Sequence, residues 1–138
     1  MTKPDLAIFD LDNTILNGDS DYSMINYLID INLLDKNAKL MNDEFIRDYQ
    51  KGKLDFNQYT NFALKPYIGK TQIEIDHIIL PFVEKIIEPM INIFALKLLH
   101  DHHDNGHKIL LASATNELIV IPIAKRLEIK SVIATKVE

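Results

Sequence analysis

The sequence contains no cysteine. That absence excludes disulfide frameworks, zinc sites built from thiolates and cysteine nucleophiles together. It also fits the reducing interior of a cell, so we expect a cytoplasmic protein. Stability does not require such crosslinks, because a fold of 138 residues buries about two thirds of the surface that its unfolded chain exposes.

Long apolar runs and clustered basic residues are missing as well. The opening residues, MTKPDLAIFD, contain only a short apolar run before a charge, and no later run reaches the length of a membrane span. The formal net charge is −5, whereas a nucleic-acid interface requires a clustered basic face. We therefore expect no membrane partner and no nucleic-acid partner, which leaves small molecules as ligands.

Three short apolar runs are typical of strands in a parallel sheet. Residues 5–9, DLAIF, lie between a proline and an aspartate, as expected for a strand that is buried on both faces. Residues 108–113, KILLAS, follow a helix end at Asn105 and Gly106, and residues 131–135, SVIAT, are rich in β-branched side chains. Helical patterns between the runs predict βαβ units, and hence an α/β fold with a Rossmann-like parallel core of about three strands.

A long helical insertion separates the first two runs. The roughly ninety residues between them are too many for one crossover and carry mostly helical patterns. We therefore predict a partial core of residues 1–17 and 89–138, with a helical insertion at residues 18–88. Within it, Asp55 has the position of a helix N-cap, and TQIE at residues 71–74 is a capping box.

The segment after the capping box is marked by prolines and histidines. Pro81 predicts a kink or a break, and Pro89 suits the first position of a helix that reaches the histidine cluster HDHHDNGH. His103 and His107 have the i, i+4 spacing with which two imidazoles can share a metal ion. The helix is expected to end at Asn105, however, where histidines interact favourably with the helix dipole, and we claim no zinc site.

Two aspartates, Asp10 and Asp12, directly follow the first predicted strand in LAIFDLDNTIL. Open α/β sheets bind ligands beyond the carboxyl ends of their strands, where Asp10 is expected. Two carboxylates one residue apart repel each other, so the pair requires a cation or a proton. Magnesium accepts one or two carboxylates with several waters, and a substrate phosphate often completes its shell. One carboxylate could attack phosphorus while the other protonates the leaving oxygen and later activates water.

Simpler interpretations of the same residues remain open. An Asp-x-Asp pair in a loop is usually a solvated turn or a helix cap. A calcium loop of the EF-hand type is excluded, because it requires glycine at the position of Ile15 and glutamate at that of Asp21. A dinucleotide-binding fold would need a glycine fingerprint that DLDNT lacks, and a receiver domain would have no large insertion after its first strand.

The segment FDLDNTIL resembles the first motif of the haloacid dehalogenase superfamily of phosphohydrolases. That motif is a hydrophobic run followed by Asp-x-Asp-x-Thr and a hydrophobic residue. The residues at these places are Phe9, Asp10, Asp12, Thr14 and Ile15. In the second motif a Ser or Thr ends a strand and binds the phosphoryl group, and ILLASAT places Ser113 there. Serine after an apolar run is more often a helix cap, so the order of the motifs carries the resemblance. A helical insertion between them is typical of the branch similar to phosphoserine phosphatase.

The resemblance implies a magnesium-dependent phosphatase that hydrolyses a small phosphorylated metabolite through an aspartyl phosphate. Asp10 is then the nucleophile and a metal ligand. Asp12 is the general acid and base, and its backbone carbonyl is on the metal. Ser113, Asn13 and Thr14 form the expected phosphate-binding set.

The helical insertion would be a cap that selects the substrate. Arg47 is a candidate for binding a substrate anion, because guanidinium groups pair well with carboxylates. A charged residue on a polar helix face is more often simply solvated. Neither the insertion nor the net charge identifies the phosphomonoester.

Two further motifs of the family have no counterpart in this sequence, namely a lysine that steadies the aspartate and phosphate charges and an acidic loop that completes the magnesium site. Lys136 is the nearest substitute for the lysine, but it lies at the end of a strand rather than on a following helix. We therefore expect a truncated chain of impaired activity, because losing one charge stabiliser costs on the order of a hundredfold to a thousandfold in rate. Its first strand would have a bare, uncharged edge, which predicts a homo-oligomer or a segment swap.

Two functions from different classes remain open at this point. The first is a magnesium-dependent phosphohydrolase represented by an incomplete chain. The second is a non-catalytic binding or assembly module that keeps the fold and a phosphate site. A chain that continues into a lysine motif and an acidic loop would favour the first, whereas a native end at residue 138 would favour the second.

Overall fold

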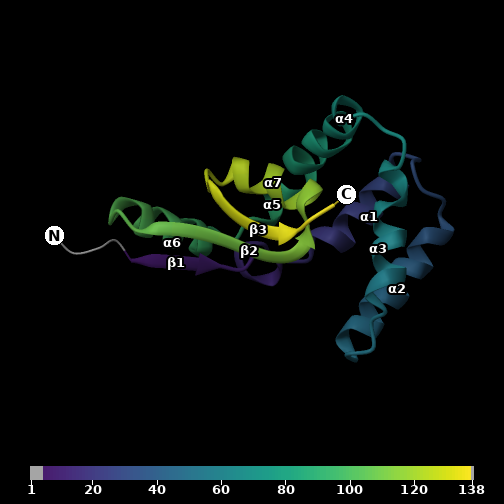
Figure 1. Ribbon diagram of the computed structural model, residues 1–138, viewed down its shortest axis with the longest axis horizontal. Coiled ribbons are helices and arrows are strands. Elements are labelled where there is room, and N and C mark those ends of the chain that lie inside the picture. The colour runs from purple at the N-terminus through teal and green to yellow at the C-terminus, as the bar shows by residue number, and fades with distance from the viewer. Residues whose placement is uncertain (1–4, 138) are drawn as a thin grey trace. The chain divides into compact units, whose positions relative to one another are not determined.

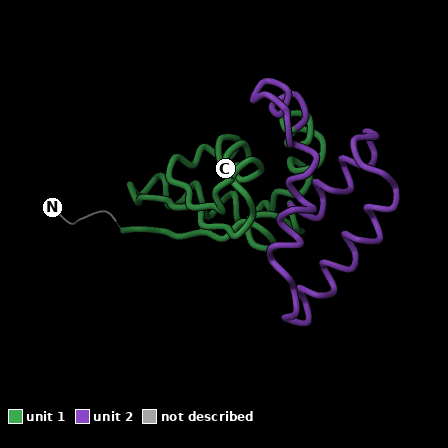
Figure 2. The backbone as a smooth tube through the Cα atoms, turned by 45° about the vertical axis from the view of Figure 1, so that its right-hand side comes forward, with its two compact units in different colours: residues 1–20, 79–138 green, residues 21–78 purple. Residues whose placement is uncertain are grey.

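The computed structural model describes residues 5–137, which form two compact units (Figures 1 and 2). The first unit combines the N-terminal segment up to Ser20 with the chain from Ile79 onward, and the second comprises residues 21–78. The predicted insertion, 18–88, is longer than the second unit, because its first three and its last ten residues belong to the first. That the second unit acts as a cap stays a prediction.

Strands occur in the first unit, whereas the second is helical. The first contains β1 (Leu6–Phe9), β2 (Lys108–Asn116), β3 (Ser131–Thr135), α5 (Glu88–Met90), α6 (Ile93–Asp104) and α7 (Glu117–Arg126). The second contains most of α1 (Ser20–Asp30) together with α2 (Asn37–Gln50), α3 (Phe56–Leu64) and the start of α4 (Gln72–Phe82). A single turn of π type lies at Val83–Ile87, and a 3-10 turn lies at Lys65–Tyr67. Residues Leu11–Ile15 form a loop whose backbone is not helical at Asp12 and Asn13. None of the helices within residues 5–137 is long and apolar enough to cross a membrane.

The strands β1, β2 and β3 form one parallel sheet in that order, which confirms the predicted α/β fold and its three strands. Figure 1 shows the three arrows side by side and pointing the same way. All four residues of β1 pair in register with residues 108–111 of β2. β2 continues beyond its predicted end to Asn116, and its register with β3 shifts between Ala112 and Asn116. This irregularity lies at the carboxyl end of the sheet.

The two faces of the sheet differ in burial. Phe9, Leu111 and Val132 occupy paired positions and therefore point to the same face. That face is covered by α6, where His102 meets the Phe9 ring edge-on at 5.8 Å between centroids, and by α7 next to β3. Right-handed crossovers that step in one direction across a sheet place both helices on one face. The opposite face exposes three large apolar side chains, those of Leu6 (58%), Ile8 (63%) and Ile133 (61%). The expectation that β1 is buried on both faces is therefore wrong, because among the described residues helices cover one face of the sheet only.

Helix caps in the second unit follow the sequence. The Asp55 carboxylate accepts the backbone N–H groups of Asn57 and Gln58, both at 3.1 Å, at the start of α3. In the capping box, the Thr71 hydroxyl accepts the N–H of Glu74 at 3.2 Å, and the Glu74 carboxylate accepts the N–H of Thr71 at 2.7 Å. Both predicted caps are therefore confirmed.

The predictions for the two prolines differ in their outcome. Pro81 lies inside α4 and does not break it, and the chain continues from Phe82 into a π turn at Val83. A kink at Pro81 stays a prediction. Pro89 belongs to the short helix α5, and α6 begins only after Asn92, whose side chain accepts the N–H of Phe94 at 2.9 Å. Pro89 thus stands near the start of α5, as its position suggested, but the prediction that this helix reaches the histidine cluster is wrong, because the Asn92 cap starts a separate helix.

The C-terminus of α6 is closed by a Schellman motif. The N–H of Gly106 donates to the carbonyl of His103, and the N–H of His107 donates to that of His102, both at 3.0 Å. The imidazoles of His102 and His107 meet at 2.9 Å between their Nδ1 atoms, so the pair in contact is not His103 with His107. Among the described residues, no group of three or more side chains of the kinds that ligate metals could hold an ion.

Candidate active site

The two aspartates lie in a loop that leaves the carboxyl end of β1, and this loop, residues 10–18, is here named the aspartate loop. Its first turn is closed by the N–H of Leu16, which donates to the carbonyl of Leu11 at 3.0 Å. Asn13 adopts a left-handed conformation with φ 56°, which asparagine tolerates better than most residues, and its N–H donates to the carbonyl of Gly18 at 2.9 Å. The loop is therefore closed by its own backbone.

Apolar side chains of the loop anchor it in the first unit. Leu11, Ile15 and Leu16 are each fully buried, whereas Asp10 is exposed. The chain just before α6 adds two backbone hydrogen bonds, because the N–H of Asn17 donates to the carbonyl of Met90 at 2.7 Å and the N–H of Asn92 donates to that of Ile15 at 2.8 Å. The backbone that carries the polar groups of the loop is thus fixed by buried side chains and by hydrogen bonds to the segment before α6.

The two carboxylates are held in different ways. Asp12 is half-buried, and each of its oxygens accepts a hydrogen bond of 2.7 Å: Oδ1 from the N–H of Ser20 and Oδ2 from the hydroxyl of Thr115. Asp10 accepts one hydrogen bond of 3.1 Å, on Oδ2 from the hydroxyl of Thr14. Asp12 is therefore fixed at both oxygens, while Asp10 keeps access to solvent.

Ser113 lies in the last part of β2, at the same edge of the sheet as Asp10, because Phe9 and Leu111 are paired across the parallel strands. Its Oγ accepts the N–H of Thr115 at 3.2 Å, so its own hydroxyl proton is left for another acceptor. The next element, α7, begins with an Asn116 side chain that accepts the N–H of Leu118 at 3.1 Å. A hydroxyl donor and a helix N-terminus thus follow each other at this edge, as an anion site requires.

The oxygen atoms of the two aspartates suit a hard cation such as magnesium, which prefers oxygen ligands. The exposed Asp10 carboxylate supplies one such ligand. Both side-chain oxygens of Asp12 already accept hydrogen bonds, which suits the expected use of its backbone carbonyl instead.

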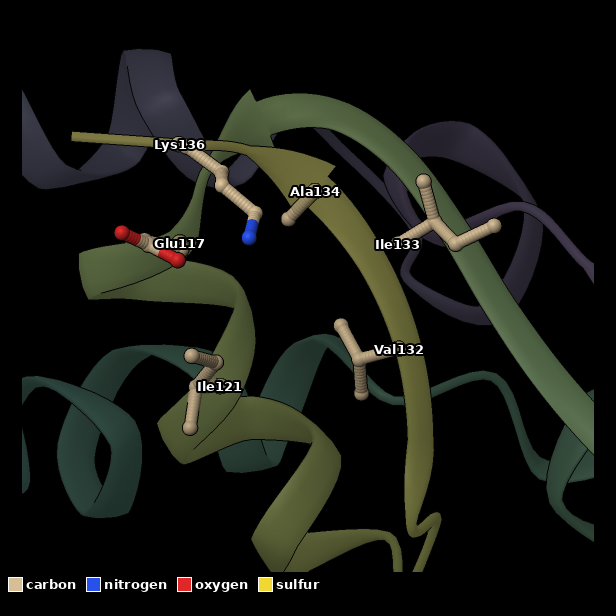
Figure 3. Close-up of a pocket in the computed structure, with 6 residues that line it drawn as sticks. All are labelled: Glu117, Ile121, Val132, Ile133, Ala134 and Lys136. Atoms are coloured by element: carbon tan, nitrogen blue, oxygen red, sulfur yellow. The ribbon is translucent and has the colours of Figure 1, made fainter.

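The sequence also singled out Arg47 and Lys136. Arg47 is exposed on α2 and belongs to the second unit. Lys136 lines a small cavity of about 170 Å³ between α7 and β3, together with Glu117 and Ile121 (Figure 3). The Glu117 carboxylate also accepts the N–H of Val137 at 3.0 Å. Lys136 is therefore part of this cavity wall.

Sequence reasoning missed Thr115 and Ser20, the two donors to Asp12. Thr115 is one of two hydroxyl residues in the segment SAT, and the pattern alone favours Ser113 as the residue that ends the strand. Ser20 contributes only its backbone N–H, which any residue except proline would offer. No side-chain signal could have identified Ser20.

This α/β fold, with two aspartates after its first strand and a hydroxyl after the next, has a counterpart among known proteins. The chain belongs to the haloacid dehalogenase-like hydrolase family, whose model matches residues 7–138.

Individual proteins resemble the chain over nearly its whole length. Histidinol-phosphatase of Neisseria meningitidis serogroup C (strain 8013) is 37% identical over 134 residues, which cover 96% of this chain and 60% of that protein. A solved protein of unknown function from Bordetella pertussis Tohama I matches with a TM-score of 0.88 and 29% identity, covering 99% of this chain and 62% of the other. A phospho-aspartyl intermediate analogue of phosphoserine phosphatase has the same fold, with a TM-score of 0.65, 17% identity and coverages of 99% and 58%. The chain thus spans about three fifths of the length of these proteins.

Proposed function

We propose that this chain carries the phosphoryl-transfer site of a magnesium-dependent phosphomonoesterase that works through an aspartyl phosphate on Asp10. The observation that carries the proposal is the unequal environment of the two carboxylates. A nucleophile has to reach phosphorus, which suits the exposed Asp10. A general acid and base has to be held in place, which suits Asp12 with a donor on each oxygen.

The proposed reaction has two steps. In the first, a carboxylate oxygen of Asp10 attacks phosphorus, the bond from phosphorus to the leaving oxygen breaks, and that oxygen takes a proton from the Asp12 carboxyl group. In the second, Asp12 takes a proton from water, the water oxygen attacks phosphorus, and the bond to Asp10 breaks, so that inorganic phosphate leaves. Magnesium, when bound, would offset the repulsion between the Asp10 carboxylate and the phosphate.

Other residues support this chemistry. The free hydroxyl proton of Ser113 is available for a phosphoryl oxygen, and Thr14 orients the nucleophile through its hydrogen bond to Asp10. Asn13 closes the aspartate loop through its N–H, which leaves its side chain for the phosphate. Arg47 is proposed to bind an anionic group of the substrate.

The substrate class proposed is a small phosphorylated metabolite whose phosphate is esterified to an alcohol. The names of the relatives support this proposal, because they are a histidinol-phosphatase and a phosphoserine phosphatase. Since the chain spans only about three fifths of these proteins, the activity of the whole protein and its magnesium dependence belong to the proposal as well.

A second candidate function is a non-catalytic assembly module. The observation that favours it is the edge of β1, which pairs with β2 and, among the described residues, with no other strand. An apolar strand with a free edge is a template for another chain, so self-association through β1 is proposed alongside either function.

Binding of beryllium fluoride with magnesium tests the phosphoryl site directly, because this complex imitates an aspartyl phosphate. We expect calorimetry to show binding to the unmodified chain and none to Asp10→Asn, which lacks the anionic oxygen. Asp104→Asn is the matched control, since Asp104 is an aspartate 80% exposed at the end of α6 and should leave binding unchanged. Absence of binding to the unmodified chain, or equal binding to Asp10→Asn, would contradict the proposal.

A further inference from the structure

Thr115 donates hydrogen bonds to both Asp12 and Ser113, the proposed proton donor and the proposed phosphate ligand. Its hydroxyl donates to Oδ2 of Asp12 at 2.7 Å, and its backbone N–H donates to Oγ of Ser113 at 3.2 Å. We infer that Thr115 is a positioning residue, which aims the Asp12 carboxyl group at the leaving oxygen and keeps it in register with the phosphate-binding hydroxyl. This inference rests on the proposed phosphatase function.

The local structure of β2 explains why Thr115 can reach Asp12. Regular pairing with β3 is interrupted between Ala112 and Asn116, so the backbone around Thr115 is not fixed by a strand ladder. Thr135 of β3 compensates, because its hydroxyl donates to the carbonyl of Ala114 at 2.6 Å. The irregular segment is therefore held from the β3 side while Thr115 points to Asp12.

Because Thr115 is buried, its hydrogen bond to Asp12 is costly to lose. Thr115 is only 6% exposed, and a buried hydroxyl that lacks a partner is costly. Oδ1 of Asp12 is already held by the N–H of Ser20, so the Thr115 hydroxyl is the second point that stops the carboxylate from turning about its Cβ–Cγ bond. A proton donor misplaced by about 1 Å can lose about a hundredfold in rate, so this second point matters for proton transfer.

Substrates with different leaving groups can distinguish a positioning role of Thr115 from a general structural role. In the first step, the bond between phosphorus and the leaving oxygen breaks while that oxygen takes the Asp12 proton. An alkoxide is a poor leaving group and needs the proton, whereas p-nitrophenolate leaves as a stabilised anion. Loss of positioning at Asp12 should therefore slow an alkyl phosphate much more than p-nitrophenyl phosphate.

The test compares kcat/KM for histidinol phosphate and p-nitrophenyl phosphate, because kcat/KM reports the steps up to aspartyl-phosphate formation. For Thr115→Val, which keeps the shape but lacks the hydroxyl, we expect a decrease of about tenfold to a hundredfold with the alkyl ester and less than about threefold with the aryl ester. Thr115→Ser keeps the hydroxyl and should stay within about threefold of the unmodified chain for both. Thr135→Val is the matched control: it loosens the same segment without touching Asp12, and it should change both substrates equally.

Equal losses with both substrates in Thr115→Val, or no loss, would overturn the inference. If the unmodified chain turns over neither ester, that result counts against the proposed function alone. The inference about Thr115 is then tested by a structural measurement. Crystal structures of the unmodified chain and of Thr115→Val should then show the Asp12 carboxylate rotated or in two orientations in the variant. An Asp12 carboxylate unchanged in the variant would overturn the inference independently of activity.

Discussion

The aspartate loop and β1 are neighbours in the sequence but are supported in opposite ways. The loop buries Leu11, Ile15 and Leu16 completely, and backbone hydrogen bonds tie it to the segment that precedes α6. β1 exposes more than half of the side chains of Leu6 and Ile8, and it has a single partner strand in the part of the chain that the structure describes. The position of the aspartates is therefore set by the loop and its anchors rather than by the strand that leads into it.

This difference indicates which changes the site tolerates. A loop fixed by its own buried side chains stays in place when the edge of the sheet is perturbed, because its anchors contact β2 and α6 instead. The donors to Asp12 come from Thr115 and Ser20, outside β1. Substitutions can therefore alter the free edge of β1 and the site separately.

The largest effect is expected for Leu11→Ala. Leu11 is fully buried, and removing such a side chain from a core costs about 2–5 kcal/mol in the free energy of unfolding. Leu6→Ala is the matched control, with the same change five residues earlier in a side chain that is 58% exposed, and it should cost less than about 1 kcal/mol. Urea unfolding of both variants gives the two values. Similar losses of stability in the two variants would contradict the conclusion that the buried side chains of the loop, and not β1, fix the position of the aspartates.

A smaller effect is expected for Ile8→Lys, which introduces a charge on the exposed face of β1. If self-association uses this strand, a charge there should raise the dissociation constant of the oligomer at least about tenfold, while beryllium fluoride binding stays unchanged. Phe94→Lys is the matched control, because that side chain is 80% exposed and belongs to α6 rather than to a strand. Sedimentation velocity over a concentration series measures both variants. A monomeric chain at all concentrations would remove the proposed role of the edge.

Much of this architecture could be predicted because its signals are local. The strand after Pro4, the capping box at Thr71 and the Asp10 and Asp12 pair each depend on a few adjacent residues. The structure contains the capping box as predicted and the strand at its predicted place, although the strand is not buried on both faces. The roles assigned to the two aspartates and to Ser113 rest on resemblance and stay predictions.

The parts that sequence reasoning missed depend on contacts between distant segments. Thr115 meets Asp12 across 103 positions in the chain, through a register shift in β2 that no periodicity indicates. Asn92, the cap that moves the start of α6 away from Pro89, was hidden because proline gives the stronger local signal for a helix start. Local rules therefore located the elements, whereas the tertiary contacts that complete the site required coordinates.

The smallest effect is expected for Glu88→Gln, which tests whether ionic contacts support the segment next to the loop. The Glu88 carboxylate accepts two hydrogen bonds from the guanidinium of Arg126, one of them at 2.6 Å from Nε. Both side chains are more than two fifths exposed, so solvent screening limits the pair to less than about 1 kcal/mol.

The pH dependence of that contribution has a definite sign. The hydrogen bonds from Arg126, followed by its charge, hold the pKa of Glu88 below its ordinary value of 4.5. The stabilisation is therefore fully present above pH 4.5, where unfolded chains carry an ionised Glu88, and it disappears as the pH falls through the lowered pKa of the folded state. Urea unfolding should show the unmodified chain slightly more stable than Glu88→Gln at pH 7, with the difference shrinking as the pH falls below 4.5. A difference that grows on acidification would contradict this sign. A difference as large as that of Leu11→Ala would show that this ion pair supports the fold as strongly as the buried apolar side chains of the loop do.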